Sequence, residues 1–223
     1  MTDELINGYQ KDCQFLVVDV ETNGLPKKRK AHYSETEVWP RIVQMSWGIY
    51  DISGNELKFE DHIINPEGQF TITKATSDIH GITQEIAKEK GVSIKKVLNK
   101  FRKDITYNDK LDVIISHNTK FDINVIKSEY SRLNRKLKTS NKEIICTMFA
   151  TTEMCKLKYK SGRGGYKFPR LEELYTNLFN CQMEKAHDSK YDVINLAKCF
   201  FHLLNNYQKT GHKHLTQFRA KSL

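Results

Sequence analysis

The stretch "FLVVDVETNGLP", residues 15–26, decides the fold of this 223-residue chain. It begins with four apolar residues, Phe15 to Val18, as expected for a strand that is buried on both faces. Asp19 and Glu21 come next, and side chains two positions apart lie on the same face of a strand. Burying ionised carboxylates is costly unless a partner offsets their charge. The strand is therefore expected to end at a site that supplies positive charge.

Length and composition set the class of protein. Hydrophobic residues make up 39% and charged residues 28% of the sequence, which is typical of a globular chain. We predict an N-terminal segment over 1–13, one domain over 14–207 and a basic tail over 208–223. The net charge of +9 favours a polyanionic partner. No apolar run approaches the roughly 20 residues of a membrane span, so no membrane association is expected.

Cysteine content and the first residues indicate the compartment. There are five cysteines, an odd number, and no C-x-x-C pair, which argues against a disulfide framework and a zinc ribbon. The polar, partly acidic segment Met1 to Gln10 does not resemble a secretory signal. We therefore expect reduced thiols and a cytoplasmic location, with a nuclear location as the alternative.

The order of strands and helices predicts an α/β fold. Three strand-like runs come first and would form an antiparallel start to the sheet: residues 15–20, 42–50 and 57–64. Ser53 to Asn55 forms a good hairpin turn between the second and third runs. Helical patterns then flank an apolar strand at 111–116, and a short strand is expected at 143–147. This alternation predicts a mixed central sheet, with some parallel strands, flanked by helices.

Two further carboxylates are predicted at the start of helices. One helix begins near Thr119 with Asp122 in its first turn, and another spans Asp192 to Asn206 with an apolar stripe at helical spacing: Val193, Leu196, Ala197, Phe200, Leu203 and Leu204. Taken alone, Asp122 is explained as part of a near-capping box with Thr119, and a histidine before a helix, such as His187, as a surface or capping residue.

Taken together, the four carboxylates predict a metal site. Asp19 and Glu21 lie at the end of a strand, and Asp122 and Asp192 at the start of helices, places that adjoin one cleft in open α/β sheets. Hard divalent cations such as Mg²⁺ prefer oxygen ligands of this kind. Bound cations would offset the charges at the end of the first strand.

Three short motifs carry a family resemblance. Asp19-Val20-Glu21, then Asn118 to Asp122 (Asn-x-x-Phe-Asp), then His187 to Asp192 occur in the order found in DnaQ-like DEDDh 3′–5′ exonucleases, which include the proofreading subunits of bacterial replicases. The stretches "TNGL", "RIVQMSWGIYD" and "IHGIT" are similar to the same family. The resemblance covers about residues 14–207, and it implies an RNase H-like fold.

The third motif resembles the DEDDh branch of that family. His187 lies five residues before Asp192, whereas the sister branch places a tyrosine four residues before its last aspartate, a position held here by Asp188. One departure is a long basic, Gly-rich insert over 156–168, where many relatives have a shorter connection. The insert leaves open which substrate is preferred, and does not affect the chemistry.

The resemblance assigns a role to each motif residue. It implies two divalent ions, Mg²⁺ or Mn²⁺, both bound by Asp19. Glu21 and Asp192 would hold the ion that activates the attacking water, and Asp122 would support the second ion. His187 would accept the proton from that water, since imidazole exchanges protons near neutral pH. The products would be nucleoside 5′-monophosphates released from a 3′ end.

Substrate contacts are expected at six positions: Val20, Thr22, Leu25, His80, Asn118 and Phe121. In similar enzymes the segment after the first motif closes over the terminal nucleotide, so the resemblance implies that Thr22 acts through its backbone and Leu25 as an apolar wedge. His80 would stack on a terminal base, or it is simply a polar turn residue before Gly81. Asn118 would orient the site, or it is simply a helix cap.

Two basic segments are candidates for phosphate contacts. Lys27 to Lys30 would form a phosphate-contacting loop, with a nuclear signal as the alternative. The insert 156–168 contains Tyr159, Tyr166 and Phe168 among its basic residues, which suits a contact with a single strand. A merely solvated loop explains the same composition.

The sequence therefore predicts a metal-dependent 3′–5′ exonuclease acting on single-stranded, frayed or mismatched DNA ends, in proofreading or repair. An exoribonuclease of the same fold and a non-catalytic interaction module are the alternatives. The expected partners are 3′ ends of nucleic acid and, as a further alternative, a DNA polymerase.

Overall fold

A five-stranded mixed sheet forms the centre of the molecule. The computed structural model describes residues 5–6, 9–28 and 30–210. The sheet has the order β5-β4-β3-β6-β7, and its strands are β3 (Gln14–Thr22), β4 (Ile42–Tyr50), β5 (Glu56–Ile63), β6 (Leu111–Ser116) and β7 (Glu143–Cys146). A separate two-stranded ribbon of β1 (Leu5–Ile6) and β2 (Tyr9–Gln10) precedes it, which the sequence pattern did not predict.

Strand directions confirm the predicted mixed sheet. The pairs β3–β4 and β4–β5 are antiparallel, while β6 runs parallel to β3 and β7 parallel to β6. The predicted hairpin joins β4 to β5, where Gly54 adopts the left-handed φ of 86° and its N–H donates to the Asp51 carbonyl at 3.0 Å. The carboxyl ends of β3 and β6 consequently meet at one edge of the sheet.

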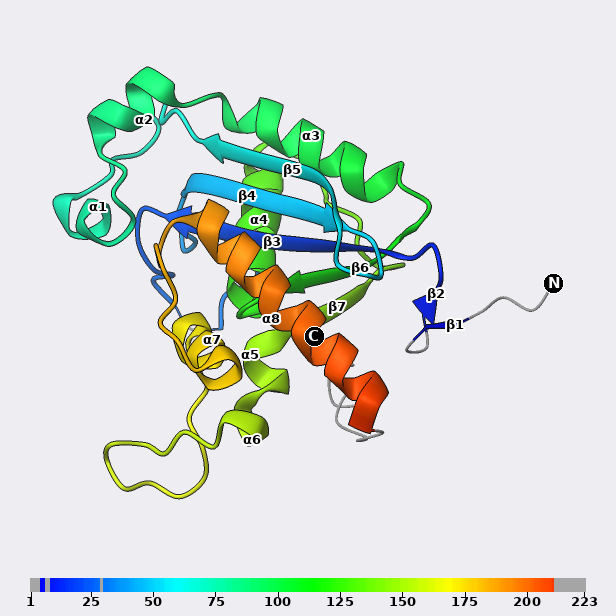
Figure 1. Ribbon diagram of the computed structural model, residues 1–223. Helices are drawn as coiled ribbons and strands as arrows, with labels where there is room; N and C mark the ends of the chain where they lie inside the picture. The colour runs from blue at the N-terminus through cyan, green and yellow to red at the C-terminus, as the bar shows by residue number, and fades with distance from the viewer. Residues whose placement is uncertain (1–4, 7–8, 29, 211–223) are drawn as a thin grey trace.

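Helices cover both faces of this sheet. In Figure 1, α4 lies behind the sheet and α8 crosses in front of it, while α3 runs along the β5 side. The helices are α1 (Lys74–His80), α2 (Gln84–Lys90), α3 (Ile94–Thr106), α4 (Thr119–Arg132), α5 (Thr147–Ala150), α6 (Thr152–Cys155), α7 (Leu171–Phe179) and α8 (Ser189–Thr210).

Alternation along β3 builds two cores and orients the acidic residues. Leu16 and Val18 are buried in the core that includes α3 and α4, whereas Phe15 and Val17 are buried against α8. Because side chains alternate between the faces of a strand, the odd-numbered Asp19 and Glu21 continue the face that is covered by α8. The strand therefore delivers both carboxylates to the first turn of that helix.

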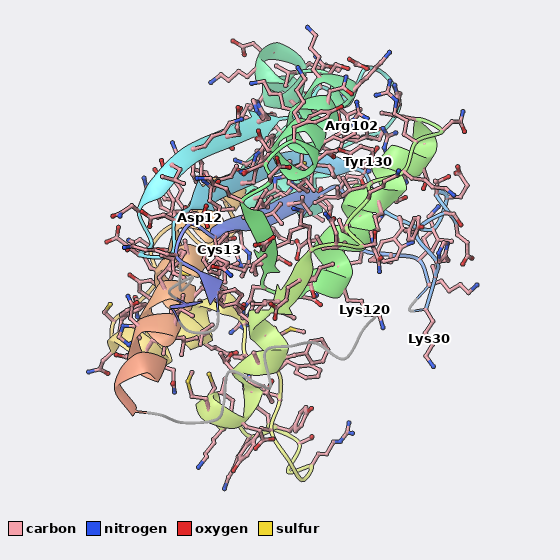
Figure 2. The ribbon with its side chains drawn as sticks, turned by 90° about the vertical axis from the view of Figure 1, so that its right-hand side faces the viewer. Asp12, Cys13, Lys30, Arg102, Lys120 and Tyr130 are labelled. Atoms are coloured by element: carbon pink, nitrogen blue, oxygen red, sulfur yellow. The ribbon has the colours of Figure 1, made fainter. Side chains whose placement is uncertain are left out.

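The opposite face is held together by α3 and α4. The Tyr130 hydroxyl of α4 donates a hydrogen bond of 2.6 Å to the Leu98 carbonyl of α3. Figure 2 shows Tyr130 beside Arg102 of α3, with Lys120 at the other end of α4 pointing outward. This fully buried tyrosine fixes α4 on the sheet, and so fixes the position of its first turn.

Helix α8 is longer than the apolar stripe predicted. It begins at Ser189, before the expected Asp192, and extends through Thr210 instead of ending at Asn206. The start of the predicted basic tail therefore belongs to this helix, and 211–223 lie outside the described residues. Leu203 is only half-buried, but the rest of the stripe is buried as predicted.

Within the described chain, no helix is both long and apolar enough to cross a bilayer.

Candidate active site

The carboxyl end of β3 carries the first two acidic side chains. The backbone of Asp19 pairs with Ser46 of β4, and a register shift follows Glu21, where the ladder with β4 becomes irregular. The hydroxyl of Ser189, the first residue of α8, donates a hydrogen bond of 2.9 Å to the Asp19 carbonyl. This bond attaches the start of α8 directly to the acidic end of the strand.

The turn after β6 delivers the third carboxylate. Asn118 is the N-cap of α4, with a left-handed φ of 91°, and its side chain makes no capping bond. The alternative that Asn118 serves as a side-chain cap is therefore not supported. Thr119 lies inside the helix, so the near-capping box considered for Asp122 is not formed. Asp122 lies in the first turn of α4 and is only 3% exposed.

The loop before α8 supplies the histidine and the fourth carboxylate. His187 has a left-handed φ of 66° and lies outside the helix, as predicted, while Asp192 lies in the first turn. The His187 backbone N–H donates to Asp192 Oδ2 at 3.1 Å. One ligand atom from each of Glu21, His187 and Asp192 lies within 4.8 Å of the other two.

Gln44 of β4, which the sequence reasoning missed, connects this loop to the sheet. Its amide Nε2 donates to Asp188 Oδ1 at 3.0 Å and to Asp61 Oδ1 at 2.9 Å, and its Oε1 accepts from the Ser189 N–H at 3.2 Å. Asp61 also accepts from the Ser46 hydroxyl at 2.8 Å. The sequence signal that could have indicated Gln44 is its position two residues before Ser46, which places two polar side chains on one face of a mostly apolar strand.

A cavity of about 330 Å³ brings the acidic side chains together. It is lined by Asp19, Val20, Glu21, His117, Asn118, Phe121, Asp122, Met148, Phe168, Pro169, Arg170, Leu171, Glu172, Met183, Ala186, His187 and Asp192. Its walls differ in character. The β3 side carries carboxylates. The wall formed by the segments around α7 and before α8 is mostly apolar, with Phe168, Pro169, Leu171, Met183 and Ala186 beside the charged Arg170 and Glu172.

Burial and mutual repulsion raise the pKa of every predicted ligand. Burial, followed by the charges of Asp122 and Asp192, raises the pKa of Asp19 well above its usual 3.8. Burial, with Asp192 and Asp122, raises the pKa of Glu21 to about 8. Burial raises the pKa of Asp122 and of Asp192 to about 7 each, with repulsion from Asp192 and from Asp188 respectively as smaller contributions.

These carboxylates also lack partners for their buried oxygens. Oδ2 of Asp19, Oδ2 of Asp122 and Oδ1 of Asp192 are buried and accept no hydrogen bond from the described part of the protein. Buried polar atoms in native proteins are nearly always satisfied. Oxygen atoms left in this state, on acids that repel one another, fit divalent cations of the Mg²⁺ class. The donor set therefore agrees with the predicted metal site.

Three predicted substrate contacts do not line the cavity. The Thr22 hydroxyl donates to the Gly24 carbonyl at 2.7 Å, and Leu25 is 81% exposed beside a separate cavity. His80 ends α1, is buried, and its Nδ1 accepts the Ile82 N–H at 3.1 Å. This position favours the structural alternative for His80. In contrast, Val20, Asn118 and Phe121 all line the cavity.

The mixed five-stranded sheet, with a carboxylate cluster at the carboxyl ends of β3 and β6, is the arrangement expected of an RNase H-like fold. A sequence model of the exonuclease family (RNase_T) matches residues 16–200. The chain belongs to this exonuclease family, and the resemblance to DnaQ-like 3′–5′ exonucleases is confirmed.

Relatives and solved structures agree with this assignment. The chain is 25% identical over 209 residues to a PolC-type DNA polymerase III from Caldanaerobacter subterraneus subsp. tengcongensis, covering 93% of this chain and 13% of that protein. E. coli Exonuclease I in complex with a dT13 oligonucleotide matches with a TM-score of 0.70 at 19% identity, over 88% of this chain and 42% of that one.

A second Exonuclease I, from Methylocaldum szegediense, matches with a TM-score of 0.67 at 16% identity, over 92% of this chain and 42% of that one. The chain thus spans less than half the length of each of these proteins. Likeness at such identity establishes the fold, which is the predicted RNase H-like arrangement.

Proposed function

We propose that the protein is a metal-dependent 3′–5′ exonuclease that hydrolyses phosphodiester bonds at DNA 3′ ends and releases nucleoside 5′-monophosphates. One observation carries the proposal. Four carboxylates of raised pKa and one histidine from three separate segments line a single cavity, and three of the carboxylates have an unsatisfied buried oxygen. Burying four carboxylates that repel one another lowers the stability of the fold, and bound cations would offset this cost. Groups of strongly shifted pKa in a cavity are typical of functional sites.

Each side chain has a defined task in this proposal. Asp19 would be the central ligand of the metal site, Glu21 and Asp192 would hold the ion that activates the attacking water, and Asp122 would support a second ion. When bound, Mg²⁺ or Mn²⁺ supplies the positive charge that activates a water and stabilises a leaving oxygen. His187 accepts the proton of the attacking water. His187 is exposed and lines the cavity, and its backbone N–H donates to Asp192.

Single-stranded or frayed DNA is the proposed substrate. The apolar wall of the cavity suits an unpaired base, while the net charge of +9 favours the phosphate chain. Val20, Asn118 and Phe121 would contact the terminal nucleotide. The similarity to a PolC-type polymerase supports a role in proofreading or repair, with a DNA polymerase as a candidate partner.

The deciding experiment is digestion of 5′-labelled oligonucleotides with and without Mg²⁺ or Mn²⁺. Single-stranded, duplex and mismatched DNA are compared with RNA of the same sequence, beside a circular strand and a 3′-blocked strand. We expect progressive shortening of free 3′ ends only when metal is present. Cutting of the circle would mean an endonuclease, faster trimming of RNA would reassign the substrate, and no cutting of any strand would leave a non-catalytic module.

A further inference from the structure

Two aromatic rings extend the apolar wall of the cavity onto the protein surface. Phe168 lines the cavity, and its ring packs edge-to-face on Phe149, with centroids 4.7 Å apart and an interplanar angle of 69°. Phe149 is 50% exposed and Phe168 is 48% exposed, so neither ring is covered by the core. We name this pair the aromatic step. Two rings at this angle form a notch that can receive the face and the edge of a third flat ring.

A partly buried histidine fixes the aromatic step relative to the acidic cluster. His117 directly follows β6 and precedes Asn118. Its Nε2 lies 2.9 Å from the Pro169 carbonyl, and its Nδ1 lies 2.9 Å from the Thr147 hydroxyl. Since a carbonyl only accepts, Nε2–H donates to Pro169. One side chain thus holds the segments that carry both rings, because Phe149 belongs to α5, which begins at Thr147.

The segment around the aromatic step has an uncompensated positive charge. Residues 155–170 contain six basic residues and no acid. Lys167 forms an ion pair with Glu173, and Arg170 with Glu172 at 2.9 Å. The other four form no ion pair with any described residue: Lys156, Lys158, Lys160 and Arg163. In Figure 1 this loop projects from the body of the protein between α6 and α7.

Exposed rings beside unpaired cations match the chemistry of single-stranded nucleic acid, in which flat bases alternate with phosphates. An apolar peptide would leave the four cations without an anionic partner, and a base-paired strand has no free base to place in the notch. We propose that the aromatic step binds one unpaired base of the substrate strand, upstream of the 3′-terminal nucleotide, and that the basic loop follows the phosphates beyond it. This inference rests on the proposed function, since it extends the same cavity.

Removing bases one at a time tests the inference. Six single-stranded oligonucleotides are compared, each with a single abasic position at a different one of the first six places from the 3′ end. Phosphorothioate linkages at these places, and Ca²⁺ in place of Mg²⁺, limit hydrolysis during the binding measurement. Affinity for the wild-type protein should fall about tenfold or more at one or two adjacent positions, since stacking on an aromatic ring is worth about 1–3 kcal/mol per base.

The Phe149→Leu/Phe168→Leu variant keeps apolar volume at two half-exposed positions, so the fold should be retained. Its affinity for the intact strand should be as low as the affinity of the wild-type protein for the sensitive abasic strands. An abasic site at those same positions should cause no further loss of affinity in the variant. Tyr107→Ala is the matched control, because Tyr107 is an aromatic residue of 70% exposure at the opposite end of the sheet, and it should behave as wild type.

The results separate this inference from the proposed function. A scan that is flat in the wild type, or equally position-dependent in the double variant, would overturn the aromatic step even if metal-dependent digestion is observed. A position-dependent scan that the variant abolishes would support the step even if no strand is hydrolysed, in which case only the proposed catalysis fails.

Discussion

Replacing Asp122 with asparagine should stabilise the metal-free protein while removing its activity. Burial raises the pKa of Asp122 from 3.8 to about 7. Between about pH 4 and pH 7, the folded protein therefore still holds a proton on Asp122 that the unfolded chain has already released. The free energy of unfolding falls as the pH rises through this window. At about 1.4 kcal/mol per pKa unit, the cost of ionised Asp122 is roughly 4 kcal/mol at pH 8.

Asparagine has the same shape and keeps an acceptor oxygen, but it carries no charge to bury. We expect Asp122→Asn to increase the free energy of unfolding in EDTA by about 2–4 kcal/mol at pH 8, since water in the cavity offsets part of the burial cost. The gain should be near zero at pH 4. Urea unfolding followed by circular dichroism at both pH values gives the two numbers.

Asp104 provides the matched control, because its carboxylate is paired. It accepts from Lys58 Nζ and from Trp47 Nε1, at 2.8 Å and 2.9 Å. Asp104→Asn should therefore lose about 1 kcal/mol at pH 8. If Asp122→Asn is destabilised at pH 8 as Asp104→Asn is, Asp122 is a structural residue, and the reasoning about uncompensated charge is wrong.

Three further outcomes follow from the same site. Mg²⁺ should raise the melting temperature more at pH 8 than at pH 5, because it binds ionised ligands, and excess EDTA should abolish hydrolysis; activity that persists in chelator would contradict the metal site. His187→Ala should lower single-turnover rates by about 10²–10⁴-fold while Mg²⁺ and DNA binding persist, and full activity would remove it as the general base. Gln44→Leu should lower stability by about 1–3 kcal/mol and weaken Mg²⁺ binding, measured by calorimetry, whereas unchanged metal affinity would show that Gln44 does not position α8.

The strands and most of the site could be predicted because their signals are local. Burial on both faces makes β3, β4 and β6 rich in apolar residues, and the predicted bounds 42–50 and 111–116 are those observed. The motif residues Asp19 and Asp122 could be located by their place at the end of a strand and the start of a helix. Helix ends are weaker signals, which is why α8 begins and ends beyond its apolar stripe.

The predicted contacts of Leu25 and His80 with the substrate came from the resemblance alone, and the fold does not bring either residue to the cavity. His80 faces the protein interior because the turn at Gly81 directs its ring inward, toward the Ile82 N–H. Nothing in the five-residue pattern "IHGIT" specifies whether the histidine ring points into the core or toward a substrate.

By itself, the sequence determined the mixed sheet, the apolar stripe of α8 and the identity of the acidic residues, since each follows from spacing within a few positions. Only the tertiary structure decided which oxygens of those acids are buried without partners, and which surface faces them. Gln44 holds Asp188, 144 positions away, and His117 holds Pro169, 52 positions away. Such contacts depend on how whole elements pack, because side chains distant in the chain meet only after the sheet and its helices have assembled.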